Sequence, residues 1–232
     1  MRVAFPDLSA MMLAAAWMRN ATLPLSKNIP SRLSFANRRF SQSVMSSHVE
    51  QGPLSPSMKV PEGADVATVA AGCFWGTEHF YRKHFGDGKG LVDCRVGYTG
   101  GEKADPSYRE VCTSTTGHAE ALQIVFDPKV VSYETLIDFF FRMHDPTTLN
   151  KQGPDTGPQY RSSIFYHNDE QKRISEELKQ KYDKTFYKNP VVTTIEPIKI
   201  FWDAETYHQL YLVNNPDGYE CPSHFLRVKP EL

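Results

Sequence analysis

Residues 65–76 read DVATVAAGCFWG and form the turn on which we expect the fold to depend. Residues 66–71 are apolar and strand-like, a glycine ends them, and the amphipathic run that follows predicts a helix from residue 73 to about 84. Cys73 is therefore expected at the helix N-terminus, where unpaired backbone N–H groups and the helix dipole stabilise a thiolate. The alternative is a structural cysteine buried beside core aromatic residues.

Strands and helices alternate along the rest of the chain. We expect further strands at 91–97, 119–126, 160–166 and about 191–201, and helices at 132–143, 169–185 and 205–213. Pro197 interrupts the last strand and predicts an edge strand or a bulge. The loop at 144–159 is long and rich in Gly, Pro and Asp, and such loops are more often functional than idle. Without a repeated βαβ unit, the pattern indicates a single two-layer α/β or α+β domain with a long C-terminal coil that wraps around it.

The first 63 residues differ from the remainder in charge. They carry seven Lys and Arg against three Asp and Glu, in a chain whose net charge is −1. Residues 1–45 are acid-poor and rich in Arg and Ser, which predicts a disordered transit peptide; the alternatives are a secretory signal and a disordered tail without a targeting role. We expect a mitochondrial protein, and a cytosolic form from an internal start at Met45 or Met58. Residues 46–63 are interpreted as a linker and 64–232 as the catalytic domain.

The composition gives no sign of a nucleic-acid-binding protein, a membrane protein or a zinc-binding protein. A net charge of −1 does not point to nucleic acid or an acidic membrane, and no run approaches the ~18 apolar residues of a membrane span. The four cysteines form no C-x-x-C pair and no zinc-knuckle spacing. This sparse cysteine pattern fits a reducing compartment in which one or two thiols do chemistry.

Residues next to Cys73 and on a later strand are candidates for a site. Phe74 and Trp75 follow the cysteine directly and form either an apolar receptor or plain core. Glu120 lies two residues after His118 at the start of a strand, so we expect both side chains on one face. Desolvation there would hold Glu120 protonated as a general acid, whereas a solvated carboxylate is the commoner state.

The other candidates lie in loops and in the tail. Tyr108, Tyr160 and Asp155 lie in or beside two irregular loops, either to hydrogen-bond a polar oxygen or as ordinary surface residues. Cys221 lies in a Gly- and Pro-flanked tail that we expect to be mobile, which suits a resolving cysteine; the alternative is a terminal cysteine of no consequence. The two remaining cysteines, Cys94 and Cys112, fall in strand-like surroundings and are expected to be inert.

Five short motifs, taken in order, resemble a known family. They are GCFWG at 72–76, GYTGG at 97–101, PSYREVC at 106–112, TGHAE at 116–120 and QYRS at 159–162. Each is weak alone, but together they resemble peptide methionine sulfoxide reductase A from about residue 65 to 225. We therefore expect an α+β fold, a single two-layer sandwich of the ferredoxin-like plait type with a mixed sheet, and no cofactor or metal.

The resemblance implies a role for each candidate residue. Cys73 is the nucleophile that attacks the sulfoxide sulfur, Phe74 and Trp75 receive the methyl group, and Glu120 donates the proton with which the oxygen leaves. Three residues orient that oxygen: Tyr108, Asp155 and Tyr160. Enzymes of this family act on the S epimer of the sulfoxide, in free methionine and in oxidised proteins, so the implied biological role is protein repair.

The resemblance also implies how the thiol is regenerated. Cys221 attacks the Cys73 sulfenic acid, and thioredoxin reduces the resulting Cys73–Cys221 disulfide. Some members carry two cysteines in a glycine-rich tail, whereas this tail carries one and resembles the subgroup with a single resolving cysteine. We expect a monomer that binds neither nucleic acid nor membrane.

Three other kinds of site remain as alternatives. A thiol hydrolase would use Cys73 with His118 as its base, which requires a third group to orient the imidazole. A metal site would combine Cys73 with His118 and Glu120, or with His79, although this spacing matches no zinc pattern. A methionine- or peptide-binding module would use the aromatic pair without turnover.

Overall fold

The computed structural model describes residues 52–228. The predicted transit peptide at 1–45 and the first part of the predicted linker lie outside the described residues. Among the described residues, no helix combines the length and the apolar character needed to cross a membrane.

A six-stranded mixed sheet forms the centre of the domain. Its strands lie in the order β7-β6-β1-β3-β2-β8. Neighbouring strands run antiparallel except β6 and β7, which are parallel. The strands are β1 (Asp65–Ala71), β2 (Leu91–Thr99), β3 (Ala119–Phe126), β6 (Ser162–Tyr166), β7 (Thr194–Pro197) and β8 (Trp202–Asp203). The domain is therefore α+β, as the alternation of elements predicts.

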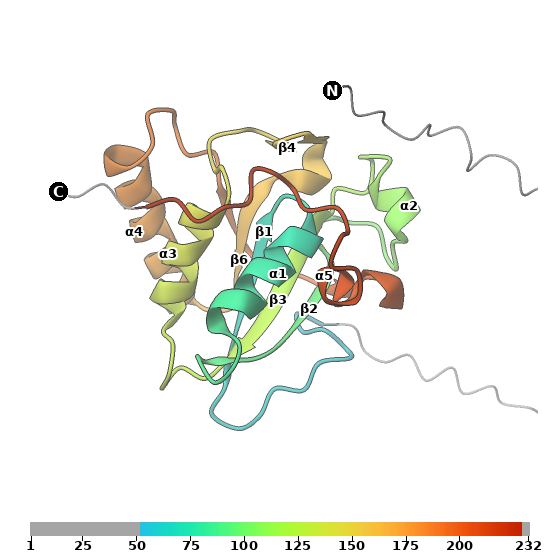
Figure 1. Cartoon of the computed structure of the whole chain (residues 1–232), viewed down its shortest axis with the longest axis horizontal. Coiled ribbons are helices and arrows are strands. Elements are labelled where there is room, and N and C mark those ends of the chain that lie inside the picture. Colours follow the sequence, from blue (N-terminus) through green and yellow to red (C-terminus); the bar gives the residue numbers. More distant parts are fainter. Residues whose placement is uncertain (1–51, 229–232) are drawn as a thin grey trace, which may run out of the picture. The chain divides into compact units, whose positions relative to one another are not determined.

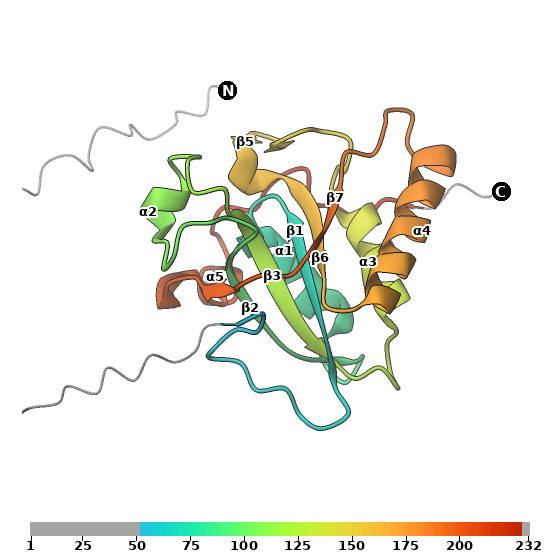
Figure 2. The ribbon, with the colours of Figure 1, turned by 180° about the vertical axis from the view of Figure 1, so that it is seen from behind.

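Three long helices pack against this sheet. α1 (Phe74–Phe85) lies over β1, β2 and β3, while α3 (Tyr133–Met143) packs on β1 and on α4 (Asp169–Thr185). Figure 1 shows α1 in front of the sheet with α3 and α4 beside it, and Figure 2 shows the opposite face. The core lies between these layers because β3 is buried along its whole length and α3 buries an aromatic face.

The second half of the predicted linker packs on the sheet. Met58 is buried against Val66 and Val125, and the Ser55 N–H donates to Gln123 Oε1 at 2.7 Å. A buried side-chain amide such as Gln123 needs partners, and this segment supplies one. Residues 52–64 therefore belong to the packing of the domain.

The structure corrects the expected elements near the C-terminus. The helix predicted at 205–213 is instead a 3₁₀ turn, η3 (Thr206–His208), and a short helix, α5 (Tyr211–Asn214). They are separated because Leu210 adopts a left-handed conformation with φ of 55°. The strand predicted at 191–201 shortens to β7, which ends at Pro197 on the edge of the sheet, where the missing N–H is tolerated.

Both irregular loops contain short elements that the pattern does not predict. The loop at 144–159 forms a two-stranded hairpin of β4 (Lys151–Gln152) and β5 (Asp155–Thr156), followed by η2 (Pro158–Tyr160). The other loop contains α2 (Tyr108–Val111), which begins with a Ser107–Glu110 capping box. Three of these elements carry a candidate residue at one end: Tyr108 begins α2, Asp155 begins β5 and Tyr160 ends η2.

The C-terminal coil wraps around the domain as expected. After α5 it crosses the end of the sheet at which β1 meets α1 and then runs beside α3 (Figure 1). Backbone hydrogen bonds fix its last described part, because the N–H of Phe225 donates to Met143 O and that of Arg227 donates to Arg142 O.

Candidate active site

Cys73 is the N-cap residue of α1, directly after β1, as the sequence predicts. The turn requires Gly72, whose φ of +89° is a conformation that favours glycine. Backbone N–H groups of Trp75 and Gly76 point to the sulfur and lower the pKa of its thiol. Burial and the charge of Glu120 outweigh them, so the pKa of Cys73 is raised well above its ordinary value. The helix terminus therefore does not by itself lower the pKa of this thiol below its ordinary value.

Glu120 lies on β3 with its carboxyl group against the start of α1. Only 1% of this residue is exposed, and its Oε2 accepts the Phe74 N–H at 3.0 Å. Burial raises the pKa of Glu120 to about 8, although the hydrogen bond from Phe74 lowers it. The carboxyl therefore carries its proton at neutral pH. The backbone N–H that it accepts belongs to Phe74, the residue directly after Cys73.

The two aromatic residues after Cys73 are fixed by residues from the C-terminal part of the chain. Phe74 is buried, and Trp75 donates its indole N–H to His208 Nδ1 at 3.1 Å. The indole ring also stacks on Tyr211 with ring centroids 3.7 Å apart. His208 lies 5.1 Å from the Phe74 ring and 5.5 Å from the Trp75 ring, measured between centroids. The aromatic pair is thus a preformed, rigid surface.

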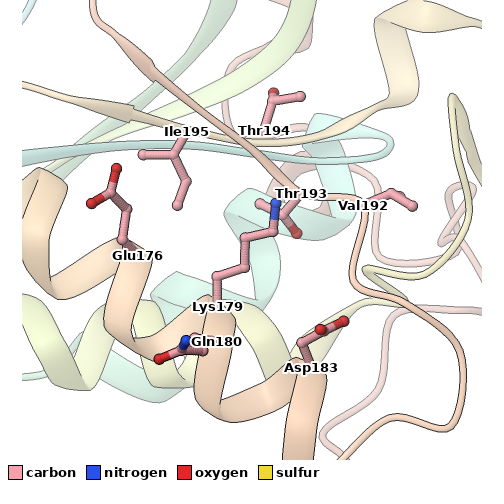
Figure 3. Close-up of a pocket in the computed structure, with 8 residues that line it drawn as sticks. All are labelled: Glu176, Lys179, Gln180, Asp183, Val192, Thr193, Thr194 and Ile195. Carbon is pink, nitrogen blue, oxygen red and sulfur yellow. The ribbon is translucent and has the colours of Figure 1, made fainter.

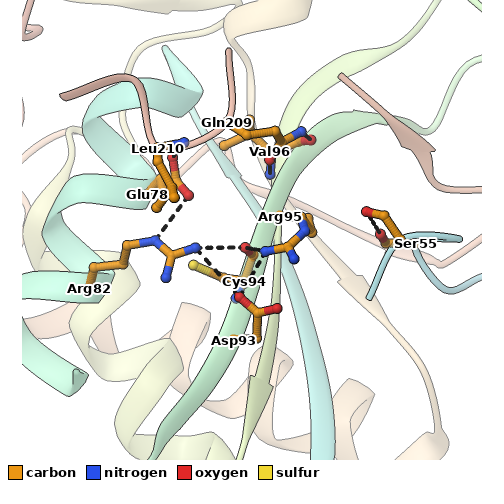
Figure 4. A network of polar contacts seen from close by, with 10 residues as sticks. Ser55, Glu78, Arg82, Asp93, Cys94, Arg95, Val96, Gln209 and Leu210 are labelled. Carbon is orange, nitrogen blue, oxygen red and sulfur yellow. Dashed lines mark hydrogen bonds and ion pairs between the residues drawn. The ribbon is translucent and has the colours of Figure 1, made fainter. Parts of the chain in front are cut away.

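A polar network holds this C-terminal segment against α1 and β2 (Figure 4). The buried Glu78 carboxylate accepts the Leu210 N–H at 2.9 Å and pairs with Arg82 at 3.0 Å. Next to it, Gln209 bonds both the N–H and the C=O of Val96 through its side-chain amide. These bonds fix Leu210 in its left-handed conformation and so place His208 and Tyr211 on either side of it.

Tyr108, Tyr160 and Asp155 lie within electrostatic range of the Glu120 carboxyl. Burial raises the pKa of both tyrosines, and the Glu120 charge raises each of them further. The Asp155 charge raises the pKa of Cys73 and of Glu120. Each of the three loop residues therefore interacts electrostatically with Glu120.

Cys221 lies beside the β4–β5 hairpin rather than on a freely mobile tail. Only 1% of the residue is exposed, and its thiol donates to Gln152 O at 3.5 Å. Close to it, the Tyr219 hydroxyl donates to the Asp155 carboxylate at 3.0 and 3.1 Å. All four cysteines are free thiols here, so the structure represents the reduced protein.

His118 does not join the site. Its Nδ1 accepts the Gly101 N–H at 3.2 Å, and its Nε2 bonds Lys103 O at 2.8 Å. The imidazole is therefore fixed to the loop after β2 with both nitrogens occupied, and it has no free nitrogen to serve as the base of a thiol hydrolase. His118 lies one residue before β3, and its bonds join it to the loop after β2 rather than to Cys73 or Glu120.

A metal centre has no support in the part of the chain that the structure describes. No group of three His, Cys, Asp or Glu side chains within residues 52–228 is placed to hold an ion. The other two cysteines differ from each other: Cys94 is buried in β2, whereas Cys112 is exposed at the C-terminal cap of α2. The sequence predicts strand-like surroundings for Cys112, and the structure instead places it at the end of a helix.

Sequence reasoning missed three residues that shape the site and a fourth, His224, that packs against the turn carrying Cys73. His208, Tyr211 and Glu205 lie in the segment read as a plain helix, and His224 lies in the tail read as coil. Glu205 accepts the Tyr98 hydroxyl at 2.9 Å and the Tyr108 N–H at 2.8 Å, which ties α2 to the sheet. The density of aromatic and polar residues at 202–211 was the available signal.

A groove elsewhere contains none of these residues. It has a volume of about 570 Å³ and lies between α4 and residues 192–195 (Figure 3). Lys179, Asp183 and Ile195 are among its lining residues. The chemistry therefore centres on the β1–α1 turn rather than on this groove.

Comparison with known proteins agrees with this geometry. The family model described as peptide methionine sulfoxide reductase matches residues 65–229. The probable peptide methionine sulfoxide reductase of Schizosaccharomyces pombe is 55% identical over 163 residues, covering 70% of this chain and 96% of that protein.

Two solved structures show the same likeness. Reduced Mxr1 from Saccharomyces cerevisiae has a TM-score of 0.72 and 48% identity, covering 76% of this chain and 99% of that chain. Mxr1 in complex with Trx2 has a TM-score of 0.55 and 36% identity, again over 76% of this chain and 99% of that chain. The matched region includes Cys73, Glu120 and Cys221. This chain therefore belongs to the peptide methionine sulfoxide reductase family.

Proposed function

We propose that the protein reduces methionine S-sulfoxide, free or within proteins, to methionine, with Cys73 as nucleophile and Glu120 as acid. The observation that carries this assignment is the protonated, buried Glu120 carboxyl held by the backbone N–H next to Cys73. A sulfoxide oxygen leaves poorly as a strongly basic anion, and a positioned acid removes this obstacle.

The reaction balances with these two groups. The Cys73 sulfur attacks the sulfoxide sulfur while Glu120 gives its proton to the oxygen. The attack forms a bond between the two sulfur atoms; this bond and the sulfur–oxygen bond of the substrate then break, methionine is released, and a new sulfur–oxygen bond leaves Cys73 as a sulfenic acid. The proton of the Cys73 thiol replaces the one that Glu120 gave, so the carboxyl is ready for the next cycle.

Substrate binding uses the apolar and polar halves of the site together. Phe74 and Trp75 receive the methyl group, because they form the rigid aromatic surface beside the sulfur. Tyr108, Tyr160 and Asp155 orient the oxygen on the side of Glu120. Selection of the S epimer follows from this division, since the mirror-image sulfoxide exchanges the methyl and oxygen positions.

Replacing His208 with phenylalanine is expected to lower kcat/KM for methyl sulfoxides about tenfold. The change leaves the Trp75 indole N–H, which donates to His208 Nδ1, without its partner, and a buried unpaired donor costs about 1–3 kcal/mol. Steady-state kinetics of the purified variant measure the effect. His79→Phe, on the helix that carries Trp75, is the matched control. Equal kinetics in the two variants would show that the orientation of Trp75 by His208 does not contribute to the reaction.

We also assign the recycling step to Cys221. Its thiol attacks the Cys73 sulfenic acid, the Cys73–Cys221 disulfide forms, and thioredoxin reduces it. Two findings support this assignment: Cys221 neighbours Gln152 and Asp155 at the site, and the related Mxr1 has been crystallised with Trx2.

Cys221→Ser is expected to stop after one turnover. Without a resolving thiol the sulfenic acid persists, so each protein molecule releases about one methionine and thioredoxin-coupled turnover is lost. Rapid-quench measurement of methionine checks this, with Cys94→Ser as the control. Mass spectrometry of the wild-type protein, oxidised by substrate without reductant, should find a Cys73–Cys221 disulfide; full thioredoxin-coupled turnover by the variant would assign the resolving role elsewhere.

The finer points of organisation are proposals of the same kind. The order β6-β1-β3-β2, with α1 and α3 as crossovers, supports a ferredoxin-like plait extended by β7 and β8. The acid-poor composition of residues 1–45 supports a transit peptide and a mitochondrial protein, with a cytosolic form from an internal start. A monomer suffices for the reaction, because all the assigned groups come from one chain.

A further inference from the structure

The C-terminal tail inserts one side chain into the turn that carries Cys73. His224 is only 5% exposed, and its Nε2 lies 2.6 Å from Ala71 O, at the end of β1. Its ring occupies the space beside Gly76, where a Cβ would overlap Nδ1. His224 therefore contacts the chain on both sides of Cys73, two residues before it and three residues after it.

The hydrogen bond to Ala71 defines the state of this imidazole. A carbonyl oxygen only accepts, so Nε2 carries the proton and Nδ1 carries a lone pair. Nδ1 is buried and has no hydrogen-bond partner within residues 52–228. Burial lowers the pKa of His224, so the ring is neutral, and the bond from Nε2–H is its polar attachment to the site.

The resolving cysteine is connected to this histidine by a short stretch of chain. The His224 N–H donates to Cys221 O at 3.0 Å, which closes a turn between the two residues. Upstream of that turn, the Cys221 thiol donates to Gln152 O and the Tyr219 hydroxyl donates to Asp155. Forming a disulfide consumes the Cys221 S–H and with it the bond to Gln152 O, whereas the bond from the His224 imidazole to Ala71 O involves neither sulfur.

We propose that His224 is a positioning residue that anchors the tail for disulfide formation. This inference rests on the proposed Cys73–Cys221 disulfide. With His224 fixed, only Pro222 and Ser223 separate it from Cys221, and the three Cα–Cα steps confine the Cα of Cys221 to roughly 10 Å from that of the anchor. The anchor lies directly against the Cys73 turn. A short tether raises the effective concentration of one thiol at the other, and this accelerates the step.

The anchored step is balanced and needs no further reagent. The Cys221 sulfur attacks the sulfur of the Cys73 sulfenic acid, and an S–S bond forms as the S–O bond breaks. The hydroxyl leaves with the thiol proton as water. His224 touches none of these atoms, so its contribution is to the probability that the two sulfur atoms meet.

His224→Ala tests the proposal by separating the two chemical steps. We expect disulfide formation after one turnover to slow about tenfold or more, because the thiol loses its short tether. Release of the first methionine should stay within about twofold of wild type, since Cys73 and Glu120 are untouched. Both are measured by rapid quench of the full-length protein, with dimedone trapping of the sulfenic acid and thiol counting by mass spectrometry.

Two further variants complete the test. His224→Gln keeps an N–H donor for Ala71 O and should recover part of the rate, whereas Leu226→Ala, an exposed neighbour in the tail, should match wild type. Disulfide formation at the wild-type rate in His224→Ala would overturn the proposal. So would an equal slowing of methionine release, which would mean that His224 only supports the turn. A wild-type protein that forms no Cys73–Cys221 disulfide would instead overturn the proposed recycling step.

Discussion

Cys73→Ser is expected to lower methionine sulfoxide reduction by at least ~10⁴-fold, because the sulfur that accepts the oxygen is gone. A serine hydroxyl at the same N-cap is a far weaker nucleophile and cannot become a sulfenic acid. The measurement is methionine formation with dithiothreitol or thioredoxin as reductant. This is the largest effect that we expect from any single substitution in the chain.

Controls for this variant come from the chain itself. Cys94→Ser changes a thiol buried in β2, and Cys112→Ser changes an exposed thiol at the end of α2. Both variants should keep the activity of the wild type. Normal turnover by Cys73→Ser would show that another group performs the attack, and the proposed mechanism would be wrong.

Glu120→Gln is expected to slow the reduction step by about 10²–10⁴-fold at neutral pH, which is the usual contribution of a positioned acid. The amide keeps the shape of the side chain but has no transferable proton. Single-turnover release of methionine in a Cys221→Ser background measures the step without recycling. Glu110→Gln, in the exposed capping box of α2, is the matched control.

The pH dependence provides a second test of Glu120. Burial raises its pKa to about 8, so the carboxyl is protonated below that pH and loses its proton as the pH rises through it. The ratio of the wild-type to the Glu120→Gln rate should therefore be constant near neutrality and fall above pH 8. A ratio that stays flat to pH 9.5 would exclude Glu120 as the acid.

The same pKa predicts that the loss of rate does not come from unfolding. An acid whose pKa is raised by folding contributes stability at low pH, and this contribution is lost as the pH rises from the unfolded value towards 8. Glutamine cannot ionise and so escapes this loss. Thermal unfolding of Glu120→Gln above pH 7 should accordingly occur at or above the temperature of the wild type.

The β1–α1 turn was predictable because its determinants are local. An apolar strand, a glycine and an amphipathic run specify the position of Cys73 within one residue. The state of the Cys73 thiol was not predictable in the same way. Its raised pKa depends on how deeply the sulfur is buried and on a carboxyl group that arrives from β3. Helix-terminus reasoning accounts for the N–H groups at the sulfur but for neither of these two contributions.

In the C-terminal region, by contrast, the local pattern predicted the wrong secondary structure. Residues 205–213 carry a helical pattern, yet Leu210 adopts a left-handed conformation because Glu78 binds its N–H and Gln209 binds Val96. Tertiary hydrogen bonds to buried groups outweigh a weak local preference for helix. That break is what presents His208 and Tyr211 to Trp75, so a feature essential to the aromatic surface had no local cause.

The sequence by itself determined the position of Cys73, its aromatic neighbours and the candidate acid, because local patterns and ordered motifs encode them. Only the tertiary structure decided that Glu120 is protonated beside a neutral Cys73 thiol, that His118 lies outside the site, and that His224 inserts beside Cys73. These outcomes depend on burial and on partners between 15 and 153 residues away in the chain, where desolvation and long-range hydrogen bonds set charge and position.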